Sequence, residues 1–267
     1  MDDATKTISL GMSHWQPPTQ RILNAAIREG GLPSTCPPGL KPLIEYLQKR
    51  TLLPSEEISM DTDSLEQQAL YYYGKLFPER LRPLFKTSAR MALLTRLLVG
   101  LVEEQELDPI CGFACGLFQN IGSLAIDMAC YPNEGEKLKQ LADVVQTGVV
   151  LHQAEISIFE TDHGLVGAKL LERWGVPDWV CESLRYHTHP ELVQKPYVSI
   201  SELAESITIS NGSVPQLSKH CLLQLGLTEE RINHFMKAYK DFVPLAFFVR
   251  DLESGTLTSI PEIGLAS

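Results

Sequence analysis

The chain has 267 residues, of which 44% are hydrophobic and 21% are charged, a composition that is ordinary for a globular protein and excludes global disorder. Its formal net charge of −10 disfavours nucleic acid or an anionic membrane surface as the main partner, because both favour a basic patch. The length allows one large domain or two small ones.

The beginning of the chain shows no charged segment followed by an apolar run, so we expect no signal peptide. We interpret residues 1–19 as a mobile lead-in. Apolar spacing then predicts a short helix over residues 20–28. After a proline-rich loop, a second helix is predicted from Leu43 to the residue before Pro54.

A third helix is predicted to start at Ser64, because Gln67 follows three residues later in the capping-box pattern. That helix runs towards Phe77. From about residue 84 onward, the apolar residues recur almost purely at helical spacing.

The next predicted helix opens at Pro109 and continues through Met128. At its centre, Gln119 and Asn120 place two neutral amides in apolar surroundings, bracketed by two glycines. Burying an amide without a partner costs about 1–3 kcal/mol. The pair should therefore either face solvent or close a polar pocket.

The remainder of the chain continues the helical pattern. Helices are predicted over residues 135–159, 161–174, 178–187, 199–209, 222–225 and 229–239. Gly175 supplies the left-handed stop of the second of these, and residues 254–267 are interpreted as a loose tail. The pattern contains no convincing strand and no internal repeat, so the predicted fold class is all-α.

Six cysteines are present: Cys36, Cys111, Cys115, Cys130, Cys181 and Cys221. None belongs to a CxxC pair, and we interpret them as small buried side chains. Free thiols in this number indicate a reducing cytoplasm. The longest apolar stretches are too short and too interrupted to predict a membrane span.

Three histidines, His152, His163 and His187, fall on apolar faces of predicted helices. A single such histidine is more often a satisfied core residue than a ligand, but several on consecutive helices could converge. Glu155 follows His152 by three residues and is interpreted as its hydrogen-bond partner. A metal-dependent hydrolase also needs hard oxygen ligands. The central helix offers two amides instead, which argues for a polar pocket without a competent metal.

Residues 116–122, Gly-Leu-Phe-Gln-Asn-Ile-Gly, resemble the GLLHDIG motif of the HD superfamily, with Gln-Asn in place of His-Asp. Downstream, the segment from Asp162 to Pro177 has the spacing H-x3-G-x2-L-x3-W-x2-P. Together with His187 before Pro190, it resembles the HDOD branch of that superfamily. HDOD domains are related to HD-GYP phosphodiesterases but usually lack an intact metal-binding set. The GYP signature is absent here.

This resemblance implies an HD-superfamily helical bundle with an N-terminal helical subdomain and additional C-terminal helices. We expect the HDOD-like domain over residues 20–212. Its N-terminal helical part would span 20–83 and its HD-like core 84–212. Residues 213–267 would then form C-terminal helices and the tail.

Carried over residue by residue, the superfamily's ligand positions are expected to line a remnant pocket: Thr87, Gln119, Asn120, His163, His187 and Glu205. The second histidine of the family's adjacent pair falls on Thr188. Since only two of these positions keep a histidine, we expect no catalytic residue, no cofactor and no bound metal, with His152, His163 and His187 as the remaining metal candidates.

We therefore predict a non-catalytic signalling or regulatory protein of bacterial type, acting through protein–protein contacts. One alternative is a sensor that binds a nucleotide or another small molecule in the remnant pocket. The other is a metal-dependent phosphohydrolase with an unusual ligand set that uses His152 and Glu155.

Overall fold

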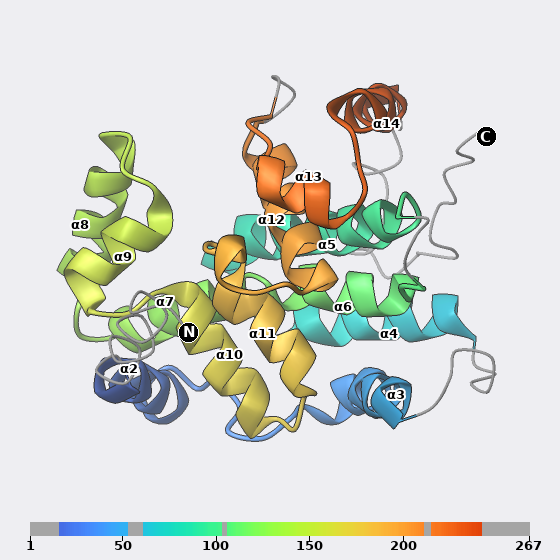
Figure 1. The fold of residues 1–267 in the computed structure, drawn as a ribbon. Helices are drawn as coiled ribbons and strands as arrows, with labels where there is room; N and C mark the ends of the chain where they lie inside the picture. Colours follow the sequence, from blue (N-terminus) through green and yellow to red (C-terminus); the bar gives the residue numbers. More distant parts are fainter. Residues whose placement is uncertain (1–15, 53–60, 103–105, 211–214, 242–267) are drawn as a thin grey trace, which may run out of the picture.

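The structure is a computed structural model that describes residues 16–52, 61–102, 106–210 and 215–241. Within these ranges the regular secondary structure is helical and no strand occurs, which confirms the all-α prediction. In Figure 1, α10 and α11 cross the middle of the molecule, α2 and α3 lie below them, and α12 to α14 lie above. The expected loose tail lies outside the described residues.

In the described residues up to Leu81, the chain forms three α-helices and two short 3-10 helices. They are α2 (Gln16–Arg28), η1 (Pro38–Leu40), α3 (Lys41–Leu52), α4 (Thr62–Gly74) and η3 (Glu79–Leu81).

The remaining helices build the centre and the C-terminal side of the molecule. They are α5 (Arg82–Val99), α6 (Pro109–Phe118), α7 (Ile121–Cys130), α8 (Gly135–Gln146), α9 (Leu151–Phe159), α10 (His163–Arg173), α11 (Asp178–Tyr186), η4 (Pro190–Leu192), α12 (Pro196–Ser210), α13 (Lys219–Gln224) and α14 (Glu229–Asp241).

The first helix begins earlier than predicted. Helix α2 starts at Gln16, so residues 16–19 belong to it and not to a lead-in. Pro17 and Pro18 lie in its first turn, where the missing backbone N–H groups would have no intrahelical partner in any case. Residues 1–15 lie outside the described ranges.

The cap of α4 also differs from the prediction. Asp61, not Ser64, is the N-cap residue, and its carboxylate accepts a hydrogen bond from the Ser64 backbone N–H at 3.2 Å. An aspartate three residues ahead of the serine therefore takes the capping position and satisfies one of the free amides of the first turn.

The hydrophobic core consists of two clusters that meet along α5. The larger cluster joins α2, α3 and α4 to α6, α7, α10 and α11, and the smaller joins α5 to α12, α13 and α14. Phe85 and Ala89 of α5 belong to the larger cluster, whereas Leu94 and Leu98 belong to the smaller. Because α5 is buried on two faces, it couples the C-terminal helices to the centre of the fold.

The predicted helix from Pro109 to Met128 is two helices. The chain turns at Gln119 and Asn120, between α6 and α7. This turn lets α6 run along α5 while α7 packs against α10. The two amides therefore lie at a helix junction and not at the centre of a continuous helix.

Close backbone packing explains the two glycines that bracket this junction. A Cβ atom at Gly116 would lie 2.3 Å from the backbone oxygen of Met91 on α5. A Cβ atom at Gly122 would lie 1.8 Å from the backbone oxygen of His163 on α10. Only glycine permits both approaches, so these residues bring the junction against the helix that carries His163.

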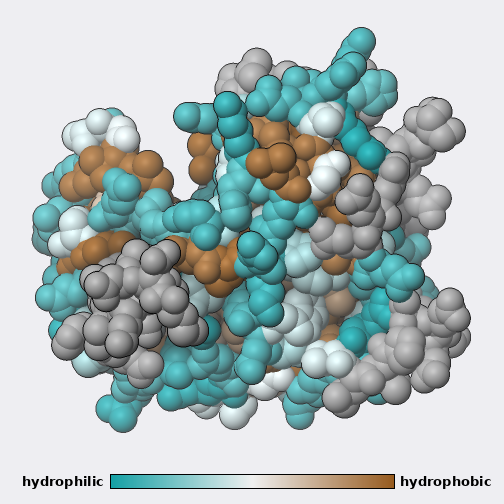
Figure 2. Space-filling model, in the orientation of Figure 1, coloured by the Kyte–Doolittle hydropathy of each residue, from teal (hydrophilic) through white to brown (hydrophobic). Residues whose placement is uncertain are grey.

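The predicted helix over residues 135–159 is also divided. Gly148, with φ of +92°, separates α8 from α9 because this backbone region is accessible mainly to glycine. Helix α8 has no buried residue, and Val145, Val149 and Val150 near its end are exposed. Figure 2 shows brown, hydrophobic surface on this projecting α8–α9 unit. By contrast, Gly175 ends the next helical unit as predicted, with φ of +77°.

The stretch Pro109–Cys130 is long and apolar enough by composition to cross a membrane. However, 83% of its most apolar window is buried inside the molecule. This burial is typical of a core segment in a folded domain.

Candidate functional site

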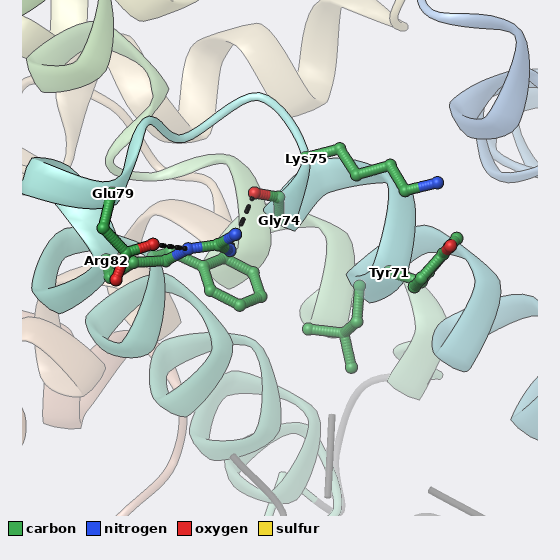
Figure 3. A pocket seen from close by; sticks show the side chains of 7 residues that line it. Tyr71, Gly74, Lys75, Glu79 and Arg82 are labelled. Atoms are coloured by element: carbon green, nitrogen blue, oxygen red, sulfur yellow. Dashed lines mark hydrogen bonds and ion pairs between the residues drawn. The ribbon is translucent and has the colours of Figure 1, made fainter. Parts of the chain in front are cut away.

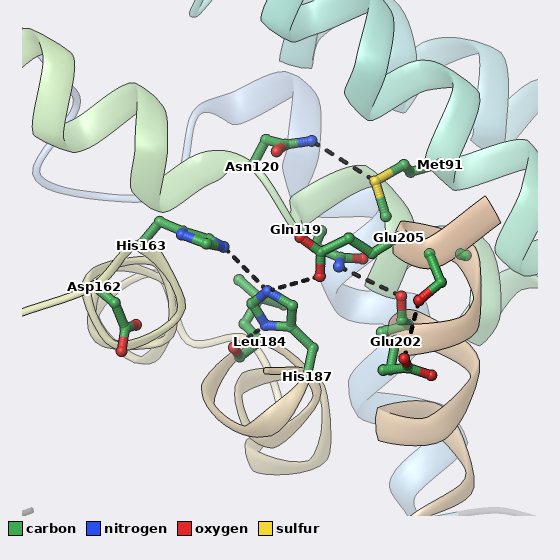
Figure 4. Close-up of polar contacts among 12 residues, drawn as sticks. Met91, Gln119, Asn120, Asp162, His163, Leu184, His187, Glu202 and Glu205 are labelled. Carbon is green, nitrogen blue, oxygen red and sulfur yellow. Dashed lines mark hydrogen bonds and ion pairs between the residues drawn. The ribbon is translucent and has the colours of Figure 1, made fainter. Parts of the chain in front are cut away.

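Gln119 and Asn120 are held by different neighbours at the junction of α6 and α7 (Figure 4). Gln119 is only 2% exposed, and its Nε2 donates to the backbone oxygen of Ser201 on α12 at 3.4 Å. Its Oε1 is buried without a hydrogen-bond partner among the described residues. The Nδ2 of Asn120 lies 4.0 Å from the Sδ of Met91 on α5. Both amides therefore face neighbouring helices.

His163 is fixed by a buried carboxylate from the preceding helix. Glu155 Oε2 accepts from the backbone N–H of His163 at 2.9 Å and lies 2.6 Å from its Nδ1. Asp162 caps α10 by accepting from the backbone N–H of Leu165. Two bonds to one oxygen set the orientation of the His163 ring and direct its Nε2 away from Glu155.

The sequence suggested that Glu155 pairs with His152. In the structure, Glu155 pairs with His163 instead. The chain reverses between α9 and α10, and this brings His163 onto the carboxylate. His152 instead lies with its ring against His189, with ring centroids 5.4 Å apart. Because a turn separates the two helices, helical spacing does not predict a contact between Glu155 and His163. The sequence therefore did not reveal this pair.

His187 follows the last residue of α11 and points towards His163. Its Nδ1 lies 2.6 Å from the backbone oxygen of Leu184, so Nδ1–H donates to that oxygen. Its Nε2 lies 3.0 Å from the Nε2 of His163 and 3.4 Å from Oε2 of Glu205 on α12. These contacts join α10, α11 and α12 (Figure 4).

The two imidazoles have opposite pKa shifts. Burial lowers the pKa of His163, but the Glu155 carboxylate outweighs this effect and raises the pKa to about 9. The pKa of His187 is lowered, first by burial and also by the neighbouring charge of His163, against the opposing influence of Glu205. At neutral pH, the protonated His163 therefore donates to both Glu155 and His187.

Most of the six expected pocket residues lie around this contact. His163, His187 and Glu205 have ligand atoms within 4.8 Å of one another. Gln119 contacts Ser201, which lies one turn before Glu205 on the same face of α12. Asn120 lies at the edge, against Met91. Thr87 donates to its own helix, at the backbone oxygen of Pro83, and no described contact connects it to the histidines.

The comparisons with known proteins identify the family. A family model for the HDOD domain matches residues 68–190. The chain contains an HDOD domain. Its bounds over residues 20–212 remain a prediction, since the family match covers a shorter segment.

Solved structures share the fold of this HDOD protein at low sequence identity. A candidate signal-transduction protein from Marinobacter aquaeolei has a TM-score of 0.59 and 13% identity, covering 90% of this chain and 58% of that one. A candidate phosphohydrolase from Shewanella amazonensis has a TM-score of 0.57 and 14% identity, covering 87% and 98%. An HDOD domain protein of unknown function from Geobacter sulfurreducens has a TM-score of 0.53 and 19% identity, covering 94% and 99%.

One curated relative is an uncharacterized protein of Treponema pallidum. It is 27% identical over 107 residues, which make up 39% of this chain and 20% of the Treponema protein. The HDOD chain thus matches only a fifth of that relative, and little more than half of the Marinobacter protein.

A separate surface cavity of about 390 Å³ lies between α4 and the start of α5 (Figure 3). Its charged groups already have partners: Arg82 donates to the backbone oxygen of Gly74 at 3.2 Å and pairs with Glu79. The Nζ of Lys75 lies 4.0 Å from the centre of the Tyr71 ring. We assign this cavity a structural role because its cations are engaged within the HDOD protein itself.

Proposed function

We propose that this HDOD protein is a cytoplasmic signalling component that regulates other proteins by direct contact and does not hydrolyse phosphoesters. The family match and the fold shared with a candidate signal-transduction protein support a signalling role. All six cysteines are free, as suits a reducing compartment.

One observation carries the non-hydrolytic part of the proposal. The Nε2 atoms of His163 and His187 lie 3.0 Å apart, and these residues are 3% and 0% exposed. A hydrolytic centre must admit a phosphoester and a nucleophilic water beside its cation. The two imidazoles here contact each other inside the fold, and the adjoining amides of Gln119 and Asn120 supply no negative charge.

The exposed apolar side chains of the α8–α9 unit support regulation by contact. Val145, Val149 and Val150 are 36%, 36% and 54% exposed. Neighbouring exposed apolar side chains often mark a protein-binding surface. Helix α8 has no fully buried residue, and only Leu138 and Leu141 among its described side chains are partly buried against the hydrophobic core.

Hydrolysis assays test the first half of the proposal. Cyclic dinucleotides and common nucleotides, assayed with added manganese or iron, should turn over no faster with the wild type than with His163→Ala. Metal-dependent turnover that disappears in His163→Ala would overturn the non-hydrolytic function.

Partner capture tests the second half. Proteins recovered from the source cell with the wild type should be lost with a Val149→Glu, Val150→Glu double variant. They should be kept with Ile209→Glu, which changes another exposed apolar residue, 72% exposed on α12. Equal recovery with the wild type, the double variant and Ile209→Glu would show that the α8–α9 unit is not the partner-binding surface.

A further inference from the structure

We propose that the outer face of α8 binds a second copy of this chain in an antiparallel helix pair, and that this self-association covers the surface assigned above to partner binding. The outer face consists of Lys139, Ala142, Asp143, Val145 and Gln146. The inference rests on the proposed function only for its regulatory half, since the pairing itself is argued from α8 and its two ends.

The outer face lies on a part of the molecule that a second copy can reach. The α8–α9 unit projects from one side of the fold (Figure 1), and its main contacts with the rest of the molecule are with α7 and α10. Lys139, Ala142 and Val145 follow one another at three-residue spacing, so they line one side of the helix. Asp143 and Gln146 lie beside them, and all five side chains are exposed. The face is therefore accessible to another molecule.

The charge of this part of the chain suits self-association. The whole chain carries a formal net charge of −10, so two copies repel each other on average. Residues 139–153 contain one lysine and one aspartate and no other Lys, Arg, Asp or Glu. The two charges cancel, so two copies can meet at this face without net repulsion between the faces.

The order of the two charges favours an antiparallel arrangement. An interface formed about a two-fold axis uses the same residues twice and must be complementary to itself. Lys139 and Asp143 lie one turn apart, and neither forms an ion pair with another described residue. When the two α8 helices run in opposite directions, Lys139 of each copy lies opposite Asp143 of the other, which gives two ion pairs. The small side chain of Ala142 lets the helices approach closely.

Exposed apolar side chains at the two ends of α8 add to this complementarity. Tyr131, shortly before the helix, is 58% exposed, and Val149 and Val150, shortly after it, are 36% and 54% exposed. In an antiparallel pair, the start of each helix lies beside the end of the other. Tyr131 of one copy therefore approaches the two valines of the other, and this removal of apolar surface from water occurs twice in each dimer.

The pairing has a regulatory consequence. Val149 and Val150 belong to the surface proposed above for other proteins, and antiparallel pairing covers them. One helix face offers less area than the about 800 Å² per partner of a standard interface, so we expect a dissociation constant of roughly 1–100 µM. The dimer is then a resting form of the HDOD protein, and dilution or a competing partner releases the surface.

Sedimentation equilibrium of the untagged full chain tests the pairing, at concentrations from about 1 to 300 µM that bracket the expected dissociation constant. We expect a reversible monomer–dimer equilibrium for the wild type. Lys139→Asp and Asp143→Lys each place like charges opposite one another, so each variant alone should dimerise at least about tenfold more weakly.

Two combinations restore the opposite charges. An equimolar mixture of Lys139→Asp and Asp143→Lys should form heterodimers, because each anion then faces a cation. The double variant with both changes exchanges the two charges and should dimerise as the wild type does. Lys219→Asp, at an exposed lysine of α13, changes the formal charge as Lys139→Asp does and should leave dimerisation unchanged.

A wild type that stays monomeric throughout this range would overturn the inference, and so would equal dimerisation by the wild type and Lys139→Asp. A mixture of the two single variants that contains no heterodimer would overturn the antiparallel pairing.

The covering of the partner surface is tested separately. Recovery of cell proteins per wild-type chain should fall as the chain is concentrated through the dimerisation range, and constant recovery would refute this regulatory half. Partners captured by a wild type that never dimerises would leave the proposed function intact and overturn the inference alone. A dimer that captures no protein at any concentration would refute the proposed function and leave the pairing in place.

Discussion

Two buried polar clusters lie at opposite ends of α6, and they differ in whether their groups satisfy one another. At the start of the helix, Asp108 accepts from the Tyr46 hydroxyl at 2.8 Å and from the Ile110 backbone N–H at 2.8 Å. It also forms an ion pair with Arg50, and its own N–H donates to the Tyr197 hydroxyl at 2.9 Å. The negative charge of Asp108 is balanced by the positive charge of Arg50, so this cluster is complete.

At the other end of α6, the cluster around His163 leaves groups unsatisfied. Gln119 Oε1 has no partner among the described residues, and Glu155 and Glu205 bring more negative charge than one imidazolium balances. The comparison teaches that burial of polar residues does not by itself indicate function. A complete cluster holds helices together, whereas an unsatisfied buried polar group in an incomplete cluster requires a separate explanation.

The largest expected effect breaks the complete cluster. Asp108→Ala removes the cap of α6 and leaves the Arg50 guanidinium, 13% exposed, without its counter-ion. We expect a loss of about 3–5 kcal/mol in the free energy of unfolding. Urea titration measures this loss. A loss below about 1 kcal/mol would show that the ion pair is dispensable.

A second variant breaks the orientation of His163. In chelator at neutral pH, Glu155→Gln should cost about 1–3 kcal/mol, because a charge-assisted hydrogen bond is lost inside the fold. The pH profile provides the sharper measurement. Since the folded pKa of His163 is raised to about 9, its contribution to stability should be fully present below about pH 6.5, the unfolded value, and be lost as pH rises to 9.

Glu155→Gln should flatten that profile, whereas Asp108→Ala should lower it without changing its slope. A wild-type profile that is flat between pH 6.5 and 9 in chelator would contradict the assignment of the extra proton to His163.

A smaller effect is expected at the edge of the complete cluster. Tyr197→Phe removes the hydroxyl that accepts from the Asp108 N–H, at a cost of about 1 kcal/mol. Thermal and urea unfolding measure this cost. Tyr186→Phe on α11 is a matched control, and a loss as large in the control would show that the effect is unspecific.

The smallest effect is expected from Gln119→Leu. The substitution removes one long hydrogen bond but also an unpartnered buried oxygen, so the free energy of unfolding should change by less than about 1 kcal/mol. A large loss of stability in chelator would show that the Gln119 amide belongs to a complete cluster after all.

The sequence by itself determined the helical class, most helix positions and the family, since these depend on local spacing of apolar residues, glycines and prolines. The stop at Gly175 and the HDOD motif around His163 are examples. The glycines at 116 and 122 also marked the junction, although the turn between them was not predicted.

Only the tertiary structure decided which polar groups meet. Glu155 reaches His163 across a reversal of the chain, and Glu205 reaches His187 from a helix that begins after η4. Asp108 contacts side chains of α3 and α12, which lie far from it in the sequence. Such contacts depend on where whole helices pack, and local periodicity carries no information about the distance between side chains on different helices. Whether the buried charges of a cluster balance could therefore be judged only from the fold.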